Sequence, residues 1–253
     1  MQMLQKLMFL ISLLIIVYGD INAQDTQQIQ ISFRPVYQGC ALTIDLESDI
    51  KLDSTDVVID LFRCYISNLE FVNKKVIGLN QSHSNKSIEL PSDDRDADAS
   101  YTMQNKVVCS IRTADCMPLL ITDEAGSFVA AIHAGWRGLA SSIIENTLKK
   151  INAKGKFIVW IGPHISQEFF EVGAEVRNIF LENDSASAEA FINAANGKYL
   201  LSMLKVAQLK LQNLGVEKIY VTKNFCTYKN ANYYSYRRET SKERMTSLIW
   251  IEE

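Results

Sequence analysis

Histidine and proline are scarce in this chain of 253 residues, and its positive charges are not clustered. It has three histidines and four prolines, its formal net charge is −3, and no run of Lys and Arg occurs along it. Proteins that bind a nucleic-acid backbone carry a basic patch or stripe, so no nucleic-acid partner is expected and a small-molecule substrate is favoured. Any chemistry that needs imidazole must use His83, His133 or His164.

Closely spaced chelating motifs and internal repeats are also absent. The chain has no CxxC or HxxxH pair and no low-complexity linker, and 47% of its residues are apolar and 22% charged. This is the composition of an ordinary globular protein, and we expect a single domain of α+β type. A chain of this size can build its core without disulfides, so we predict mostly free thiols for Cys40, Cys64, Cys109, Cys116 and Cys226.

The first 23 residues have the pattern of a secretory signal peptide. Lys6 precedes the apolar run 7–17, and Ala23 ends a short segment before a polar stretch. This core is too short for a typical membrane-spanning helix. We therefore expect cleavage after Ala23, an exported or periplasmic domain over residues 24–253, and no stable membrane span after processing. An uncleaved anchor or a start codon placed too early are the alternatives, and without a signal the protein would be cytoplasmic.

Apolar periodicity predicts most of the secondary structure. Runs of strand length occupy 107–111, 117–121 and 128–132, and a 3.6-residue period after Gly135 predicts a helix. The Asp- and Ser-rich stretch 91–100 is expected to be exposed. Further strands are expected at 29–33, 41–46, 76–79, 157–161, 217–222, 233–236 and 247–251, and further helices at 56–69, 173–181 and 199–214.

Cys116 and His133 each lie at the end of an apolar strand-like run. With His83 they offer one sulfur and two nitrogen donors, and a catalytic zinc site typically has three protein ligands and a fourth position for water. Their wide spacing in the sequence makes this weak evidence. A buried thiol and an ordinary surface histidine remain the alternative.

The residues after His133 strengthen the case for a site. Gly135 and Gly138 allow the backbone to turn sharply and to approach a ligand closely. Between them, Trp136 offers a stacking surface and Arg137 an anion-binding group. A core aromatic and a surface salt bridge are the alternative roles of these two residues.

Other polar residues have two possible roles each. Asp115 could handle protons or fix its loop. Arg237 and Arg238 are adjacent and directly follow the strand expected at 233–236. If the extended backbone continues through them, one of the two could reach the site and bind phosphate in a bidentate manner, or both could be solvated. His164 follows Gly162-Pro163 and lies either near the pocket or at the surface. Glu171 is a second candidate for proton transfer.

Several segments together resemble the YfiH family, also labelled the laccase-domain or polyphenol oxidase type. They occur in the family's order over roughly residues 77–251 and are Thr113-Ala114-Asp115-Cys116-Met117-Pro118, His133-Ala134-Gly135-Trp136-Arg137-Gly138, Ile161-Gly162-Pro163, Phe170-Glu171-Val172-Gly173, Cys226-Thr227-Tyr228 and Tyr234-Ser235-Tyr236-Arg237-Arg238.

The resemblance implies an α/β/β/α layered sandwich and a zinc ion held by His83, Cys116 and His133. It also implicates Arg238 in activity. Similar proteins cleave adenosine, inosine, guanosine and methylthioadenosine with phosphate and deaminate adenosine. An older interpretation makes them copper-dependent phenol oxidases, yet multicopper catalysis needs many more histidines than three. The expected catalytic residues are thus Cys116, Asp115 and Arg238, the expected substrate-binding residues are Trp136, Arg137 and His164, and the pattern leaves the oligomeric state open.

The chain departs from the family pattern around the expected pocket. Residues 30–60 lack an Arg-x-Gly-Gly-x-Ser segment, Ser84 replaces a glycine, His164 replaces a cysteine, Ser202 replaces an aspartate and Glu243 replaces a glycine. The metal ligands are kept while the pocket changes. The third hypothesis, which the signal-peptide pattern favours most, is an exported metal-binding protein or an enzyme that hydrolyses cell-wall precursors.

Overall fold

The computed structural model describes residues 75–152, 155–240 and 242–251, and the backbone of three further strands, β1 (Ile11–Val17), β2 (Gln30–Val36) and β3 (Gly39–Asp45). The expected helix at 56–69 lies outside these residues, as do the side chains of Cys40 and Cys64. The described cysteines, Cys109, Cys116 and Cys226, are free thiols, as predicted.

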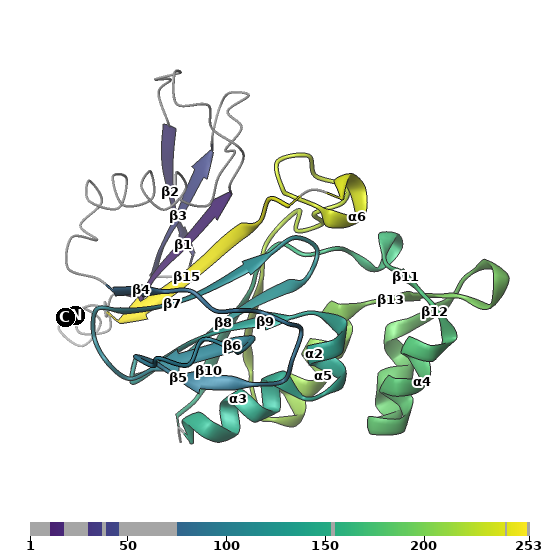
Figure 1. Cartoon of the computed structure of the whole chain (residues 1–253), viewed down its shortest axis with the longest axis horizontal. Coiled ribbons are helices and arrows are strands. Elements are labelled where there is room, and N and C mark those ends of the chain that lie inside the picture. The colour runs from purple at the N-terminus through teal and green to yellow at the C-terminus, as the bar shows by residue number, and fades with distance from the viewer. Residues whose placement is uncertain are drawn as a thin grey trace.

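Two six-stranded sheets form the framework (Figure 1). Sheet A has the order β2-β3-β1-β15-β7-β4, with β4 at Lys75–Ile77, β7 at Val107–Thr113 and β15 at Met245–Ile251. Sheet B has the order β14-β10-β8-β9-β6-β5, with β5 at Ser87–Glu89, β6 at Ala99–Thr102, β8 at Met117–Asp123, β9 at Val129–Ala134, β10 at Phe157–Ile161 and β14 at Lys218–Val221.

A small third sheet and the helices complete the described part of the chain. The small sheet has the order β11-β13-β12, at Glu171–Val172, Tyr199–Leu201 and Phe191–Asn193. The α-helices are α2 (Trp136–Ala140), α3 (Ile143–Ile151), α4 (Ala174–Asn183), α5 (Met203–Asn213) and α6 (Tyr236–Glu239), and short 3₁₀ turns lie at Gln167–Phe169, Ser185–Ala190 and Ala195–Gly197. None of the helices in the described residues has the length and apolar character needed to cross a bilayer.

The central strands of sheet B, β8 and β9, are buried on both faces, which explains why they are nearly continuously apolar. Because side chains alternate along a strand, Leu119 and Ile132 pack with the helix residues Leu139 and Ile144. Their neighbours, such as Leu120, pack in the core between the two sheets. Figure 1 shows α2, α3 and α5 on the face of sheet B that is turned away from sheet A. The expected single domain of mixed α and β type is confirmed.

Three predicted elements differ from the structure. The expected helix over 199–214 begins as strand β13 and becomes helix α5 only after Ser202, whose hydroxyl accepts a hydrogen bond from Lys205 N at 3.1 Å. The expected strand over 233–236 is wrong because Ser235 caps helix α6 in the same way, through Arg238 N. The helix expected after Gly135 is two helices, separated where Ser142 has a φ of 68°.

The expectation of exposure for residues 91–100 is wrong for the second half of the stretch. Ala97, Asp98, Ala99 and Ser100 are all 0% exposed, because β6 begins there and pairs with β9, Ala99 opposite Ile132. The acidic composition of residues 91–100 does not indicate strand β6, because β6 is buried by pairing with β9, which lies about 30 residues further along the chain.

The apolar run near the N-terminus contains a strand. Residues Ile11–Val17 form β1, which pairs antiparallel with β15 from Ile11 opposite Ile251 to Val17 opposite Met245. It also pairs with β3. Cleavage after Ala23, which stays a prediction, would remove this strand from sheet A.

Candidate metal centre

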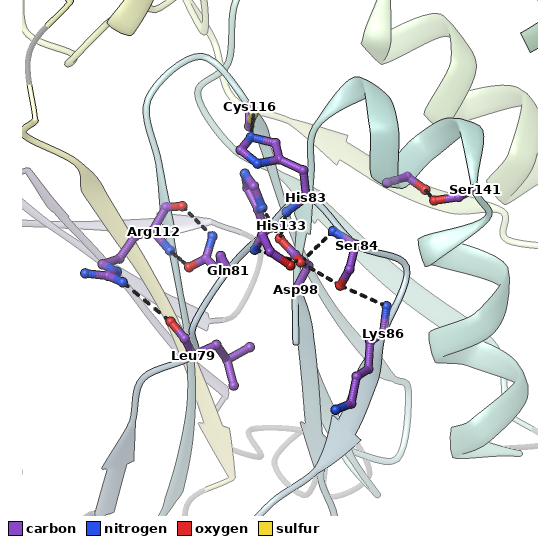
Figure 2. A network of polar contacts seen from close by, with 12 residues as sticks. Leu79, Gln81, His83, Ser84, Lys86, Asp98, Arg112, Cys116, His133 and Ser141 are labelled. Carbon is purple, nitrogen blue, oxygen red and sulfur yellow. Dashed lines mark hydrogen bonds and ion pairs between the residues drawn. The ribbon is translucent and has the colours of Figure 1, made fainter. Parts of the chain in front are cut away.

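Three side chains meet where the turn between β7 and β8, the end of β9 and the loop after β4 come together (Figure 2). The ligand atoms of His83, Cys116 and His133 lie within 4.8 Å of one another. Cys116 Sγ is 3.6 Å from His83 Nε2. The antiparallel pairing of Pro118 with His133 fixes the distance between the cysteine strand and the histidine strand.

The backbone at Gly135 allows this close approach. A Cβ atom at that position would lie 2.9 Å from Cys116 Sγ and 3.0 Å from His83 Cδ2. Real Cβ atoms do not pack at such distances, so a larger residue would push one ligand away. His83 itself has a φ of 63°, a left-handed conformation that is uncommon for residues other than glycine.

Cys116 and His133 each shift the other's pKa toward its charged form. Burial opposes the Cys116 thiolate, but hydrogen bonding to His133 and His83 outweighs it and lowers the pKa to about 6. Burial likewise opposes a charged His133, but hydrogen bonding to Asp98 and Cys116 raises its pKa to about 9. The cysteine is therefore largely a thiolate at neutral pH, which is the form that binds metals.

Asp98 is the polar residue of this centre that sequence reasoning missed. It is 0% exposed, and its Oδ1 accepts a hydrogen bond from His133 Nδ1 at 2.7 Å. Burial works against its charge, but hydrogen bonds from His133, Ser84 and Ser82 outweigh it and hold the pKa of Asp98 well below its usual range. Figure 2 shows its carboxylate directed at both His133 and the loop that carries His83. An aspartate between alanines, just before Ser100 and Tyr101, was the only available signal.

Asp115 supports the cysteine loop from the other side. Its Oδ1 accepts a hydrogen bond from Thr227 Oγ1 and its Oδ2 one from Arg237 N, both at 2.6 Å. The side chain of Asp115 is buried, and its backbone has a left-handed φ of 80°. Of the two roles considered from the sequence, the contacts favour fixing the loop.

The guanidinium group of Arg238 is occupied by backbone carbonyls. Nη1 donates to Thr227 O at 2.5 Å and to Tyr228 O at 3.0 Å, and Nη2 donates to Tyr233 O at 2.7 Å. Nε donates to Glu239 at 2.7 Å. These bonds make Arg238 the organiser of the 227–233 loop.

Two of the expected substrate-binding residues adjoin the metal centre. Trp136 and Arg137 open helix α2 directly after Gly135. Trp136 is half-buried and packs on the helix side of the core, while Arg137 is exposed and stacks on it, with Cζ 4.4 Å from the ring centroid. A solvent-facing guanidinium therefore lies two residues beyond the glycine that touches Cys116.

His164 belongs to a different environment. It is 0% exposed, its ring stacks on Phe225 at 4.4 Å, and its Nδ1 donates to Gly162 O at 2.8 Å. Burial lowers its pKa to about 4, against the weaker effect of the Gly162 carbonyl. It belongs to the wall of a cavity of about 510 Å³ whose other lining residues include Ser166, Met203 and Phe225, and the three ligands are not among them.

The donor set fits a transition-metal ion. One thiolate and two imidazoles suit both zinc and copper. His83 is exposed, Cys116 half-buried and His133 buried, so the cluster is open on the His83 side. Three ligands with an accessible face are the arrangement of a catalytic site.

A domain of two packed sheets, with a His–Cys–His centre at the ends of its strands, defines the class of protein. The chain belongs to the family described as multi-copper polyphenol oxidoreductase laccase, whose model matches residues 35–252. This agrees with the resemblance to the YfiH family that the motifs indicate.

Named relatives and solved structures agree with this assignment. A protein of Shigella flexneri named purine nucleoside phosphorylase YfiH is 41% identical over 182 residues, which are 70% of this chain and 74% of the relative. A purine nucleoside phosphorylase of Haemophilus influenzae is 42% identical over 182 residues, which are again 70% of this chain and 74% of the relative. The crystal structure of a Neisseria meningitidis protein superposes with a TM-score of 0.74 and 30% identity over 94% of each chain. Relatives with the phosphorylase name support an enzyme of the transferase type.

Proposed function

We propose that this chain is a zinc-dependent purine nucleoside phosphorylase that also deaminates adenosine, built on a domain spanning residues 24–253. Adenosine, inosine, guanosine and methylthioadenosine are the proposed nucleosides. One observation carries the proposal: the His83, Cys116 and His133 side chains converge in a chain about 40% identical to proteins named purine nucleoside phosphorylases.

Zinc held by these three residues would supply a Lewis acid that orients phosphate or activates water. In phosphorolysis the bond between the sugar C1′ and the purine nitrogen breaks, a phosphate oxygen bonds to C1′, and the purine nitrogen takes up a proton. Arg137 is an exposed cation two residues after Gly135, and we propose that it binds the negatively charged phosphate. Trp136 stacks with it and limits its movement.

The remaining expected residues act less directly. Asp115 and Arg238 are assigned to hold the cysteine loop and the 227–233 loop, since their polar atoms are already bonded there. His164 lines the separate cavity. If substrate extends toward this cavity, His164 would accept a hydrogen bond through Nε2.

The test is incubation of zinc-loaded protein with inosine, with and without phosphate. Hypoxanthine and ribose-1-phosphate should form only when phosphate is present, and adenosine alone should yield inosine and ammonia. Cys116→Ala and His133→Ala should abolish both reactions, while Asp94→Asn, at an exposed carboxylate paired with Lys86, should not change them. Product formation by both centre variants at the unaltered rate would contradict the proposal.

A copper-dependent phenol oxidase is the second candidate, and the description of the matching family favours it. Copper(II) binds thiolate and imidazole more strongly than zinc does. The chain has three histidines, too few for several copper ions. Oxygen uptake with a phenol by the copper-loaded protein, together with no release of base from nucleosides, would replace the first proposal by this one.

The N-terminal pattern supports export, and with it the third candidate, a metal-binding protein or cell-wall-precursor hydrolase outside the cytoplasm. Cleavage after Ala23 remains our proposal for residues 1–23. Sequencing the N-terminus of the mature protein tests it. A chain starting at Gln24 supports export, and an intact Met1 contradicts cleavage and agrees with strand β1 in sheet A.

A further inference from the structure

We propose that Asp98 is the positioning residue of the metal centre and holds both histidines in their ligating arrangement. This inference rests on the metal-binding part of the proposed function and not on the substrate. Asp98 lies just before β6, and its carboxylate contacts the segments of two of the three ligands.

The loop that carries His83 is folded around this carboxylate. Three consecutive backbone N–H groups donate to it: Ser82 N and Ser84 N to Oδ2 at 3.1 and 2.7 Å, and His83 N to Oδ1 at 2.9 Å. The Ser84 hydroxyl adds a fourth bond at 2.7 Å. His83 adopts its left-handed φ of 63° inside this loop, and such a conformation persists only when surrounding contacts determine it. Asp98 supplies those contacts.

The same carboxylate fixes the orientation of His133. His133 Nδ1 donates to Oδ1 at 2.7 Å, and His133 N donates to the Asp98 carbonyl at 2.8 Å. When Nδ1 carries the proton, Nε2 is the nitrogen offered to a metal. Asp98 therefore selects the ligating atom as well as the direction of the ring.

Cys116 is supported independently. Its loop is tied through Asp115 to Thr227 and to Arg237 N, and among the described residues none of the hydrogen bonds of the Asp98 carboxylate involves Cys116. The histidine half and the cysteine half of the centre thus have separate anchors. The role of Asp98 can be measured with the cysteine in place.

The experiment compares zinc affinity, by competition with a chromophoric chelator, in the unaltered protein, Asp98→Ala and Asp98→Asn. An asparagine cannot accept on both sides: its amide NH₂ would face either the Ser82 and Ser84 N–H groups or His133 Nδ1. We therefore expect both variants to bind zinc about 10- to 100-fold more weakly. Their cobalt(II) complexes should also show an altered absorption spectrum. Asp94→Asn, on the same loop and exposed, is the matched control and should bind like the unaltered protein.

Zinc affinity within twofold of the unaltered protein and an unchanged cobalt spectrum in both variants would overturn the proposal. If neither variant folds, NMR of the zinc-loaded unaltered protein with ¹⁵N-labelled histidine shows which nitrogen of His133 bonds to the metal. Metal bonding through His133 Nε2 with a protonated Nδ1 is expected, and bonding through Nδ1 would overturn the role. If the unaltered protein binds zinc but does not cleave nucleosides, only the proposed activity is contradicted, because the affinity ratios do not involve a substrate.

Discussion

At the scale of single residues, the missing side chain of Gly135 sets the spacing of the metal centre. Replacing it with alanine would place a Cβ atom 2.9 Å from Cys116 Sγ. We expect Gly135→Ala to lose about 1–3 kcal/mol of stability through overpacking and to bind zinc on the order of tenfold more weakly.

Gly78→Ala is the matched control, because a Cβ atom there has nothing within 4 Å. Chelator competition and thermal unfolding of both variants check this prediction. Equal zinc affinities for the two variants would show that the cysteine loop can move aside at no cost.

The protonation states of two residues predict a pH-dependent metal affinity. With the pKa of Cys116 at about 6 and that of His133 at about 9, the metal-free centre at pH 7.5 is a thiolate beside an imidazolium. A metal ligand must be deprotonated, so binding should release about one proton, from His133. Affinity should rise about tenfold per pH unit from 6 to 9 and level off above 9. Calorimetry in buffers of different ionisation enthalpy measures the proton count, and zero protons at pH 7.5 would contradict the assignment.

At the scale of elements, polar contacts help to hold the segment from β14 to α6, together with the ring stacking of Phe225 on His164 and of Tyr228 on Phe169. Asp115 binds it at two points, and Arg238 binds three carbonyls within 227–233 at 3.0 Å or less. In place of the strand expected over 233–236, this segment has the end of a loop and the start of α6, and the Arg238 guanidinium group holds the loop.

Arg238→Lys tests this dependence. Lysine keeps the charge but presents a single ammonium in place of a planar fork, so faster amide hydrogen exchange is expected in residues 226–240. We also expect kcat/KM to fall on the order of 10- to 100-fold through misplacement, with zinc affinity unchanged. Arg237→Lys is the control, because Arg237 is exposed and its side-chain hydrogen bonds measure 3.4–3.5 Å. Unchanged exchange together with a raised KM for phosphate would instead make Arg238 a phosphate ligand.

At the scale of the whole molecule, a metal ion held by His83, Cys116 and His133 would link segments from both sheets, so we expect it to stabilise the entire domain. A ligand present at 1,000 times its Kd adds about 4 kcal/mol to the free energy of unfolding. For a domain of this size, each kcal/mol raises Tm by roughly 2–4 °C. Removing zinc with a chelator should therefore lower Tm by about 8–16 °C. The same chelator should leave the Tm of Cys116→Ala unchanged, and an equal drop in that variant would point to another binding site.

The sequence predicted what neighbouring residues determine. Apolar runs of strand length located β8, β9 and β10, and the 3.6-residue period located most of α3, all to within a few residues. The strand-end positions of Cys116 and His133 indicated a site. The predictions that were wrong concern residues whose structure depends on contacts with segments far away in the sequence. Asp98 could not be recognised because its burial results from β6 pairing with β9. Likewise, 199–201 has an apolar helical pattern but is drawn into a strand by pairing with β11 and β12.

The pairing of β8 with β9 gives the centre a further property. Side chains alternate along a strand, so a shift of this pairing by one residue would turn His133 to the opposite face of the sheet. Its imidazole would then point away from Cys116 and His83. All three proposed ligands would therefore meet only in the aligned hairpin, with Pro118 opposite His133. A bound ion would thus favour the native strand register during folding, because it would stabilise only molecules whose strands are paired in that register.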